Sequence, residues 1–145
     1  MTGKNRTRVR PSFRKSFTLD ATPTEVFSLL TDARKIRRWS GQKGTVQPKI
    51  GGRFSMFDGW AKGVVLAYAP GKLLSTTWIA EDWGARALPS IVSYRFARHG
   101  RKTRVSIVHR NLTDTSAAAA HRSGWYEFVI NPLKHHLTLK HKEHA

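Results

Sequence analysis

Apolar and polar residues alternate along much of the chain, which is the pattern of β-strands with one buried face. Runs of this kind, at residues 12–20, 45–48, 53–57, 62–69, 73–79, 90–97 and 102–109, predict six to seven strands. The pairs Asp58-Gly59, Pro70-Gly71 and His99-Gly100 separate neighbouring runs and are typical of tight turns. Turns this close together predict an antiparallel sheet with its apolar residues on one face.

The segment after the first predicted strand has a clear helix start. Thr22 is a favourable N-cap, Pro23 fits the first helical position, and Glu25 can complete a capping box. A second short helix is predicted over residues 33–39, and it should end near Gly41.

The last third of the chain returns to a helical pattern from about Thr115 to Lys140. Trp125 and Phe128 can share its apolar face. Pro132 lies inside this helix, where it removes a backbone hydrogen bond and clashes with the carbonyl of Phe128, so we expect a kink there.

The order of these elements predicts an α+β fold. An antiparallel sheet of this length must bury one face, and only the final helix is long enough to cover it. The alternation also predicts which side chains point inward, with Val65 and Ala67 sharing one face of their strand.

Several short segments stand out by their order and spacing: residues 22–27, 33–39, Gly51-Gly52-Arg53-Phe54, Asp58-Gly59, residues 63–66, 70–74, Thr77-Trp78, 103–109 and 121–125. Together these segments resemble the START-like (birch-allergen-like, SRPBCC) superfamily. Within it, the chain is most similar to the small single-domain bacterial form of the family of activators of heat-shock protein 90 ATPase homologues. The resemblance implies a helix-grip fold, a curved antiparallel sheet wrapped around the C-terminal helix, with a cavity between them. The basic N-terminal segment and Pro132 depart from the family pattern.

We therefore expect a small hydrophobic or amphipathic ligand to bind between the sheet and the C-terminal helix, without catalysis and without a cofactor. The candidate ligand-binding residues are Trp39, Phe54, Met56, Trp60, Val65, Thr76, Trp78, Val92, Tyr94, Ile107, His109, Trp125 and Phe128. The alternative is that these residues only fill the core, which is the usual role of buried aromatic side chains.

For a histidine, two tryptophans and four acidic residues, the sequence leaves more than one role open. His109 ends an apolar strand face, where it can orient a ligand, or simply bond to a nearby carbonyl or water. Trp60 and Trp83 fall in predicted turns or loops, where they can line a cavity mouth, anchor a partner or pack locally. The spacing does not place the carboxylates of Asp58, Glu81, Asp82 and Glu127 relative to the cavity.

No catalytic or metal-binding motif is evident. The chain has no cysteine and no Gly-x-Ser-x-Gly elbow, and its nine carboxylates form no pair that spacing alone identifies. His135 and His136 are adjacent, so on a helix they point about 100° apart and cannot chelate one ion.

The composition adds a strong positive charge. The formal net charge is +17, and six basic residues and no acid lie within residues 1–15. Such a charge favours salt-dependent binding of polyanions, through the N-terminal segment and through Arg34, Lys35, Arg37 and Arg38, although no nucleic-acid-binding motif is present. The alternative is a solvated surface with a disordered tail.

The length fits one domain, which we expect to span residues 12–140, between a disordered basic tail (1–11) and a short C-terminal tail (141–145). We expect a cytoplasmic protein, because neither a secretory signal nor a membrane-spanning stretch is evident. A monomer or weak homodimer is expected.

The resemblance also implies a second function, a co-chaperone-like interaction with a heat-shock protein 90 homologue and a role in the stress response.

Overall fold

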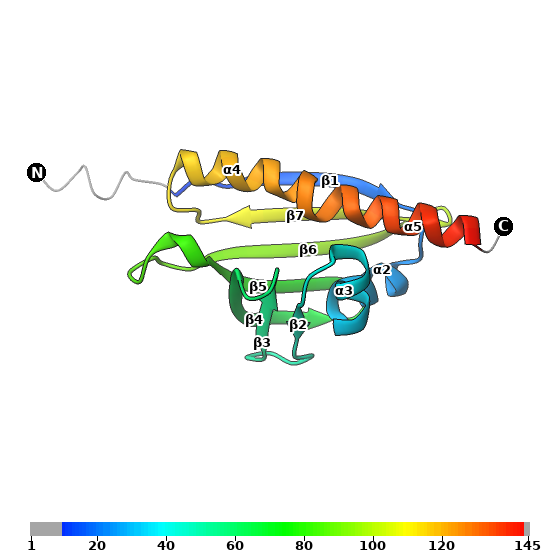
Figure 1. Cartoon of the computed structure of the whole chain (residues 1–145), viewed down its shortest axis with the longest axis horizontal. Coiled ribbons are helices and arrows are strands. Elements are labelled where there is room, and N and C mark those ends of the chain that lie inside the picture. Colours follow the sequence, from blue (N-terminus) through cyan, green and yellow to red (C-terminus); the bar gives the residue numbers. More distant parts are fainter. Residues whose placement is uncertain (1–9, 144–145) are drawn as a thin grey trace, which may run out of the picture.

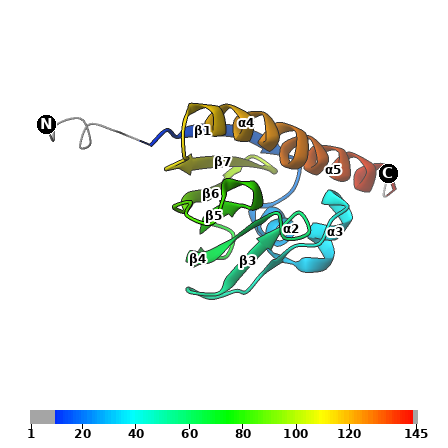
Figure 2. The same ribbon diagram turned by 60° about the vertical axis from the view of Figure 1, so that its left-hand side comes forward.

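A seven-stranded antiparallel sheet, curved around a long C-terminal helix, makes up most of the molecule (Figures 1 and 2). The computed structural model describes residues 10–143. The elements in chain order are β1 (Phe13–Leu19), α2 (Pro23–Thr31), α3 (Ala33–Ser40), β2 (Thr45–Val46), β3 (Arg53–Met56), β4 (Ala61–Ala69), β5 (Leu73–Ala80), the 3₁₀ turn η1 (Glu81–Trp83), β6 (Ser90–His99), β7 (Lys102–Arg110), α4 (Thr115–Trp125), the π-helical turn η2 (Tyr126–Ile130) and α5 (Asn131–Glu143). The strand order is β1-β7-β6-β5-β4-β3-β2. This is the α+β helix-grip arrangement that the sequence predicts.

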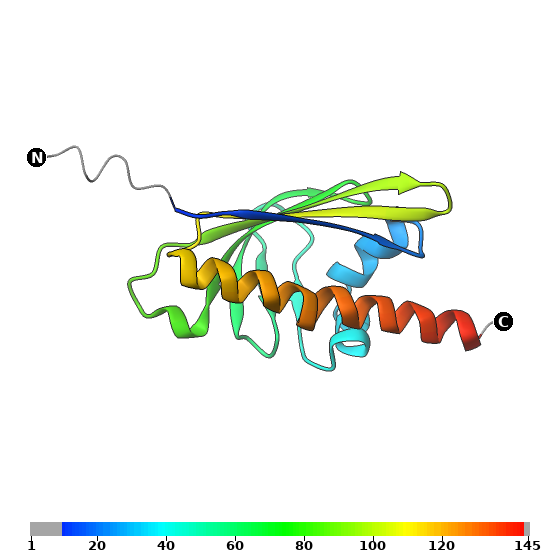
Figure 3. The ribbon, with the colours of Figure 1, turned by 90° about the horizontal axis from the view of Figure 1, so that it is seen from above.

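The inner face of the sheet is built by the alternation seen in the sequence. In β6 and β7, Val92 pairs with His109 and Tyr94 pairs with Ile107, and all four side chains are buried. The C-terminal helix lies across this face, as Figure 3 shows from above. The apolar residues of both layers form one continuous core.

The prediction that Val65 and Ala67 share a face is wrong. The register of β4 against β5 shifts between these residues, with Val65 opposite Thr76 but Ala67 opposite Ser75. One extra residue in β4 is a β-bulge, and a slip by one residue turns the following side chains to the other face of the sheet.

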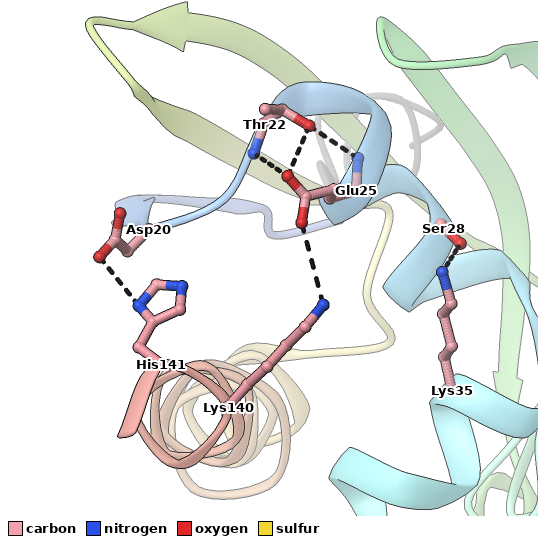
Figure 4. Close-up of polar contacts among 7 residues, drawn as sticks. All are labelled: Asp20, Thr22, Glu25, Ser28, Lys35, Lys140 and His141. Carbon is pink, nitrogen blue, oxygen red and sulfur yellow. Dashed lines mark hydrogen bonds and ion pairs between the residues drawn. The ribbon is translucent and has the colours of Figure 1, made fainter. Parts of the chain in front are cut away.

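The helix start predicted at Thr22 is confirmed. The Thr22 hydroxyl accepts a hydrogen bond from the Glu25 backbone N–H (3.2 Å), and the Glu25 carboxylate accepts one from the Thr22 N–H (3.2 Å), as Figure 4 shows. These bonds lower the pKa of Glu25. The second helix, α3, ends at Gly41, whose φ of 76° lies in the left-handed region that favours glycine.

The final helix remains helical through Pro132, and the expected irregularity takes the form of the π turn η2. In this wider turn the Asn131 N–H bonds to the Tyr126 carbonyl, five residues earlier. A wider turn also changes which residues share a face. One turn after Trp125 the buried residues are Val129 and Ile130.

Phe128 is therefore not a core residue, which corrects the prediction. Its side chain is 53% exposed, whereas Trp125 is 3% exposed and lies in the core as predicted. Ordinary helical spacing places residues three apart on one face, but the π turn rotates Phe128 away from it.

Both ends of the described chain contact the body of the protein. In α5, Lys140 lies 4.0 Å from the Glu25 carboxylate and His141 lies 3.2 Å from Asp20 (Figure 4). The helix runs to Glu143, beyond the expected boundary at residue 140. Arg10 donates to the carbonyls of Leu88 and Pro89, at 3.1 and 3.3 Å. The rest of the expected basic tail, residues 1–9, lies outside the described residues.

Candidate functional site

A pocket of about 850 Å³ opens between helix α4 and the β3–β4 and β5–β6 connections. Its wall is mostly apolar, with a few acidic and polar groups. The lining residues are Gln42, Phe57, Asp58, Trp60, Trp78, Glu81, Asp82, Trp83, Ser116, Ala117, Ala120, His121, Gly124, Trp125, Phe128 and Val129. This volume lies in the range of small-molecule sites, about 300–1,000 Å³.

Aromatic rings form the walls of the pocket. Trp78, on β5, packs against Trp125 with a centroid separation of 5.3 Å. At the mouth, Phe57 lies 6.3 Å from both Trp60 and Phe128. Such rings supply large rigid contact surfaces and hold one another in place.

The tight turn between β3 and β4 places Phe57 and Asp58 at the mouth. Both residues have φ near +57°, at 56° and 57°, a conformation uncommon for residues other than glycine and especially for a bulky one. Asp58 is fixed there by two bonds to Lys43, because its carboxylate accepts from the Lys43 N–H (2.8 Å) and its own N–H donates to the Lys43 carbonyl (3.0 Å).

His121 projects from α4 toward the aromatic walls. Its ring stacks on Trp60 (5.7 Å between centroids) and lies 5.3 Å from the ring of Trp83. Nε2 accepts a hydrogen bond from the Trp78 indole (3.2 Å), so Nδ1 carries the proton and donates to the Ala117 carbonyl (3.1 Å). Burial lowers the pKa of His121, against the opposing effects of the Ala117 bond and the negative charge of Asp82. The imidazole is therefore neutral at neutral pH.

His109 lies behind the pocket wall and is fully buried. Nδ1 accepts from the Trp125 indole (3.2 Å). The Ser90 hydroxyl donates to the Trp78 carbonyl (2.8 Å), so His109 Nε2 donates to Ser90 (2.8 Å). In this hydrogen-bonded network of Trp125, His109, Ser90 and Trp78, the neutral imidazole leaves no polar side-chain atom without a partner. Burial lowers the pKa of His109 to about 3, and the nearby His121 adds to the shift.

The structure divides the predicted ligand-binding residues into three groups. Trp60, Trp78, Trp125 and Phe128 line the pocket. Phe54, Met56, Val65, Thr76, Val92, Tyr94, Ile107 and His109 are buried in the core on the inner face of the sheet, outside the pocket lining. Trp39 packs between α2 and α3, where its indole donates to the Leu29 carbonyl (2.6 Å).

Thr76 was predicted to offer a polar group to a ligand. Its side chain is 1% exposed, lies outside the pocket lining, and its hydroxyl has no hydrogen-bond partner among the described residues. Burial also raises the pKa of Tyr94, another predicted polar group. Both residues therefore serve the core.

Several pocket residues were missed or left unplaced by the sequence. Trp83, for which lining a cavity mouth was one of three alternatives, lines the pocket, as do the unplaced acids Asp58, Glu81 and Asp82, whereas Glu127 does not. His121 was noticed only as part of the segment 121–125. Its position four residues before Trp125, on the same helical face, was the available signal.

Within residues 10–143, no group of three or more His, Asp or Glu side chains is placed to hold a metal ion. Within the same range, no helix is both long and apolar enough to cross a membrane.

The fold is that of an α+β helix-grip protein, with a pocket of about 850 Å³ beside α4. The family model for "Activator of Hsp90 ATPase homolog 1-like protein" matches residues 20–138, and the chain belongs to this family.

Named relatives agree with this assignment. An "Activator of 90 kDa heat shock protein ATPase homolog" from Dictyostelium discoideum is 25% identical over 114 residues, which are 78% of this chain but 29% of that protein. The chain thus spans less than a third of that relative's length. An HSP90 activator from Plasmodium falciparum has a similar structure (TM-score 0.75, 23% identity, covering 83% of this chain and 91% of that one). So does the Aha1 dimer from Colwellia psychrerythraea (TM-score 0.72, 19% identity, 88% and 96%). At these identities the two structures support the fold alone.

Proposed function

We propose that this protein binds a small, largely apolar ligand in the pocket under α4. The observation that carries the proposal is the pocket itself, about 850 Å³ in volume and walled by the indoles of Trp60, Trp78, Trp83 and Trp125. A few placed polar groups among apolar walls are the usual make-up of small-molecule sites.

Binding rather than turnover is proposed, because the histidine that lines the pocket is already engaged. Both ring nitrogens of His121 hold hydrogen bonds within the protein, to Trp78 and Ala117. To act as a general base, His121 would need a ring nitrogen free to reach the substrate proton. Ser116, the lining residue with a hydroxyl, comes from the same helix, but no bond joins it to His121.

The proposal is tested with the uncharged dye Nile red and by native mass spectrometry of gently purified protein. Ala120 lines the pocket and its neighbour Ala119 is exposed outside it, so Ala120→Trp should fill the pocket and Ala119→Trp should not. We expect dye binding to weaken at least about tenfold in the first variant only. No dye uptake and no bound molecule, or equal binding by both variants, would contradict the proposal.

Membership of the family supports a second candidate, a co-chaperone-like interaction with a heat-shock protein 90 homologue and with it a role in the stress response. The test is the ATPase rate of such a chaperone with and without this protein, together with co-purification of the pair. An unchanged rate and no complex would remove this candidate.

Sedimentation velocity in the same buffer tests whether the chain is a monomer or a weak dimer.

The charge distribution supports a third candidate, salt-dependent polyanion binding. None of the seven strands contains an Asp or Glu, whereas Arg14, Arg104 and Arg110 are exposed on the outer face of the sheet. In the predicted α3 cluster, Arg34, Arg37 and Arg38 are exposed, and Lys35 bonds to Ser28 (2.7 Å; Figure 4). Binding of a short DNA duplex should weaken steeply with salt, and deletion of residues 1–9 should reduce that slope. Salt-independent or undetectable binding would count against it.

A further inference from the structure

The charge of the pocket is opposite to that of the molecule. The chain carries 26 Lys and Arg and nine Asp and Glu. Three of those acids, Asp58, Glu81 and Asp82, line the pocket, and among residues 10–143 no Lys or Arg does. A protein with a net charge of +17 would be expected to place basic residues at almost any surface site, so an acidic pocket free of them points to the charge of its occupant.

The acids are held in place by the turns that carry them. Glu81 and Asp82 form the 3₁₀ turn η1, and the Glu81 N–H donates to the Trp60 carbonyl (2.7 Å). Asp58 is fixed by its bonds to Lys43 (2.8 and 3.0 Å). These bonds connect each acidic turn directly to a neighbouring part of the pocket rim.

The aromatic rings between the acids add a second preference for positive charge. Trp60 and Trp83 both contact His121 and both line the pocket beside the acids. The negative face of an indole attracts a cation within about 6 Å, and sites made of several such rings bind quaternary ammonium groups. His121 itself is neutral and its Nδ1 proton is used by Ala117, so it contributes no positive charge.

We infer that the ligand of this pocket is an amphipathic organic cation. Its ammonium group lies at the mouth, near Asp58, Glu81 and Asp82 and against the ring faces of Trp60 and Trp83. Its apolar body lies deeper, against Trp78 and Trp125, where the wall carries no charge. This inference rests on the proposed function, because it assigns a ligand class to the same pocket.

Three probes with the same twelve-carbon tail test it: dodecyltrimethylammonium, dodecyl maltoside and dodecyl sulfate, each below its micelle-forming concentration. Binding is followed by NMR at the indole N–H resonances of Trp60, Trp78, Trp83 and Trp125, so that contacts elsewhere on the basic surface do not count. We expect the cation to bind about tenfold more tightly than the uncharged probe, and the anion most weakly, against the overall positive charge.

Two variants identify the groups responsible. Exchanging both exposed acids of η1 (Glu81→Gln with Asp82→Asn) should remove most of the cation's advantage over the uncharged probe. Glu127→Gln, an exposed acid of η2 outside the pocket lining, is the matched control and should have no effect.

The outcomes separate this inference from the proposed function. If no probe moves the indole resonances, both fail. If the uncharged probe binds but the cation binds no more tightly, or the anion binds best, the pocket holds a ligand and only the cationic class is overturned. Equal loss of cation binding in the η1 variant and the Glu127→Gln control would likewise overturn it.

Discussion

The buried imidazole of His109 makes the stability of this protein depend on pH. The folded state holds the ring neutral, because Nδ1 must accept from Trp125 and Nε2 donates to Ser90. Its pKa is about 3, against the ordinary value of 6.5. Between these values the unfolded chain binds a proton that the folded chain does not. Stability is therefore complete above about pH 6.5 and is lost as the pH falls toward 3.

The size of the effect follows from the two pKa values. At about pH 4.5, two units below 6.5, the His109 contribution to the free energy of unfolding is lower by about 3 kcal/mol than at neutral pH. Burial also lowers the pKa of His121, so that residue adds a loss of the same sign.

Urea unfolding followed by circular dichroism, at about pH 7.5 and about pH 4.5, measures the loss. The comparison is with His109→Gln, which cannot be protonated but can still accept from Trp125 and donate to Ser90. His121 and the carboxylates act in both proteins, so the difference between the two pH dependences isolates His109. We expect the wild type to lose about 3 kcal/mol more than the variant.

Parallel pH dependences in the two proteins would refute the reasoning. If the variant does not fold, an NMR titration of His109 in the wild type decides the matter, since a ring that titrates near 6.5 is not held neutral by its surroundings.

Other substitutions test the packing. Thr76→Val should raise stability by about 1 kcal/mol, because it removes a buried hydroxyl that has no hydrogen-bond partner in the described part of the chain. Thr77→Val should lower stability by about 1 kcal/mol, because the Thr77 hydroxyl accepts a hydrogen bond from the Val64 N–H (2.8 Å). Chemical denaturation measures both variants, and the opposite order of stabilities would contradict these hydrogen-bond assignments. Trp125→Ala should cost about 3–5 kcal/mol and Phe128→Ala about 1 kcal/mol or less, since Trp125 is buried and Phe128 is half exposed. Equal costs in thermal melting would show that the π turn does not rotate Phe128 out of the core.

The elements that depend on local chemistry were predictable from the sequence. The Thr22–Glu25 capping box fixes the start of α2, and the alternation in β6 and β7 identifies the buried face of the sheet. For Ala67 and Phe128, the sequence predicted the wrong face of the strand or helix, and both errors have the same cause. Each follows an inserted residue, in a β-bulge or a π turn, that shifts the regular period without an obvious mark in the sequence.

The candidate site was less predictable because it lies beyond the regular strands. Periodicity identifies inward-facing residues, but it does not separate those that fill the core, such as Tyr94, from those that border a cavity, such as Trp78. The mouth is built by turns, and the fold places Asp58 and Asp82 on the lining of the same pocket. No spacing along the chain predicts that meeting, because it depends on the curvature of the sheet and the position of α4.

The five indole N–H resonances offer the most direct test of the central claim, that a ligand occupies the pocket under α4. Four indoles line the pocket, whereas that of Trp39 is bonded to the Leu29 carbonyl between α2 and α3 and serves as an internal control. Titration with dodecyltrimethylammonium should shift the resonances of Trp60, Trp78, Trp83 and Trp125 together, with one dissociation constant, and leave Trp39 in place. No shift at the four with this probe or with dodecyl maltoside, or a shift of Trp39 equal to theirs, would contradict the account.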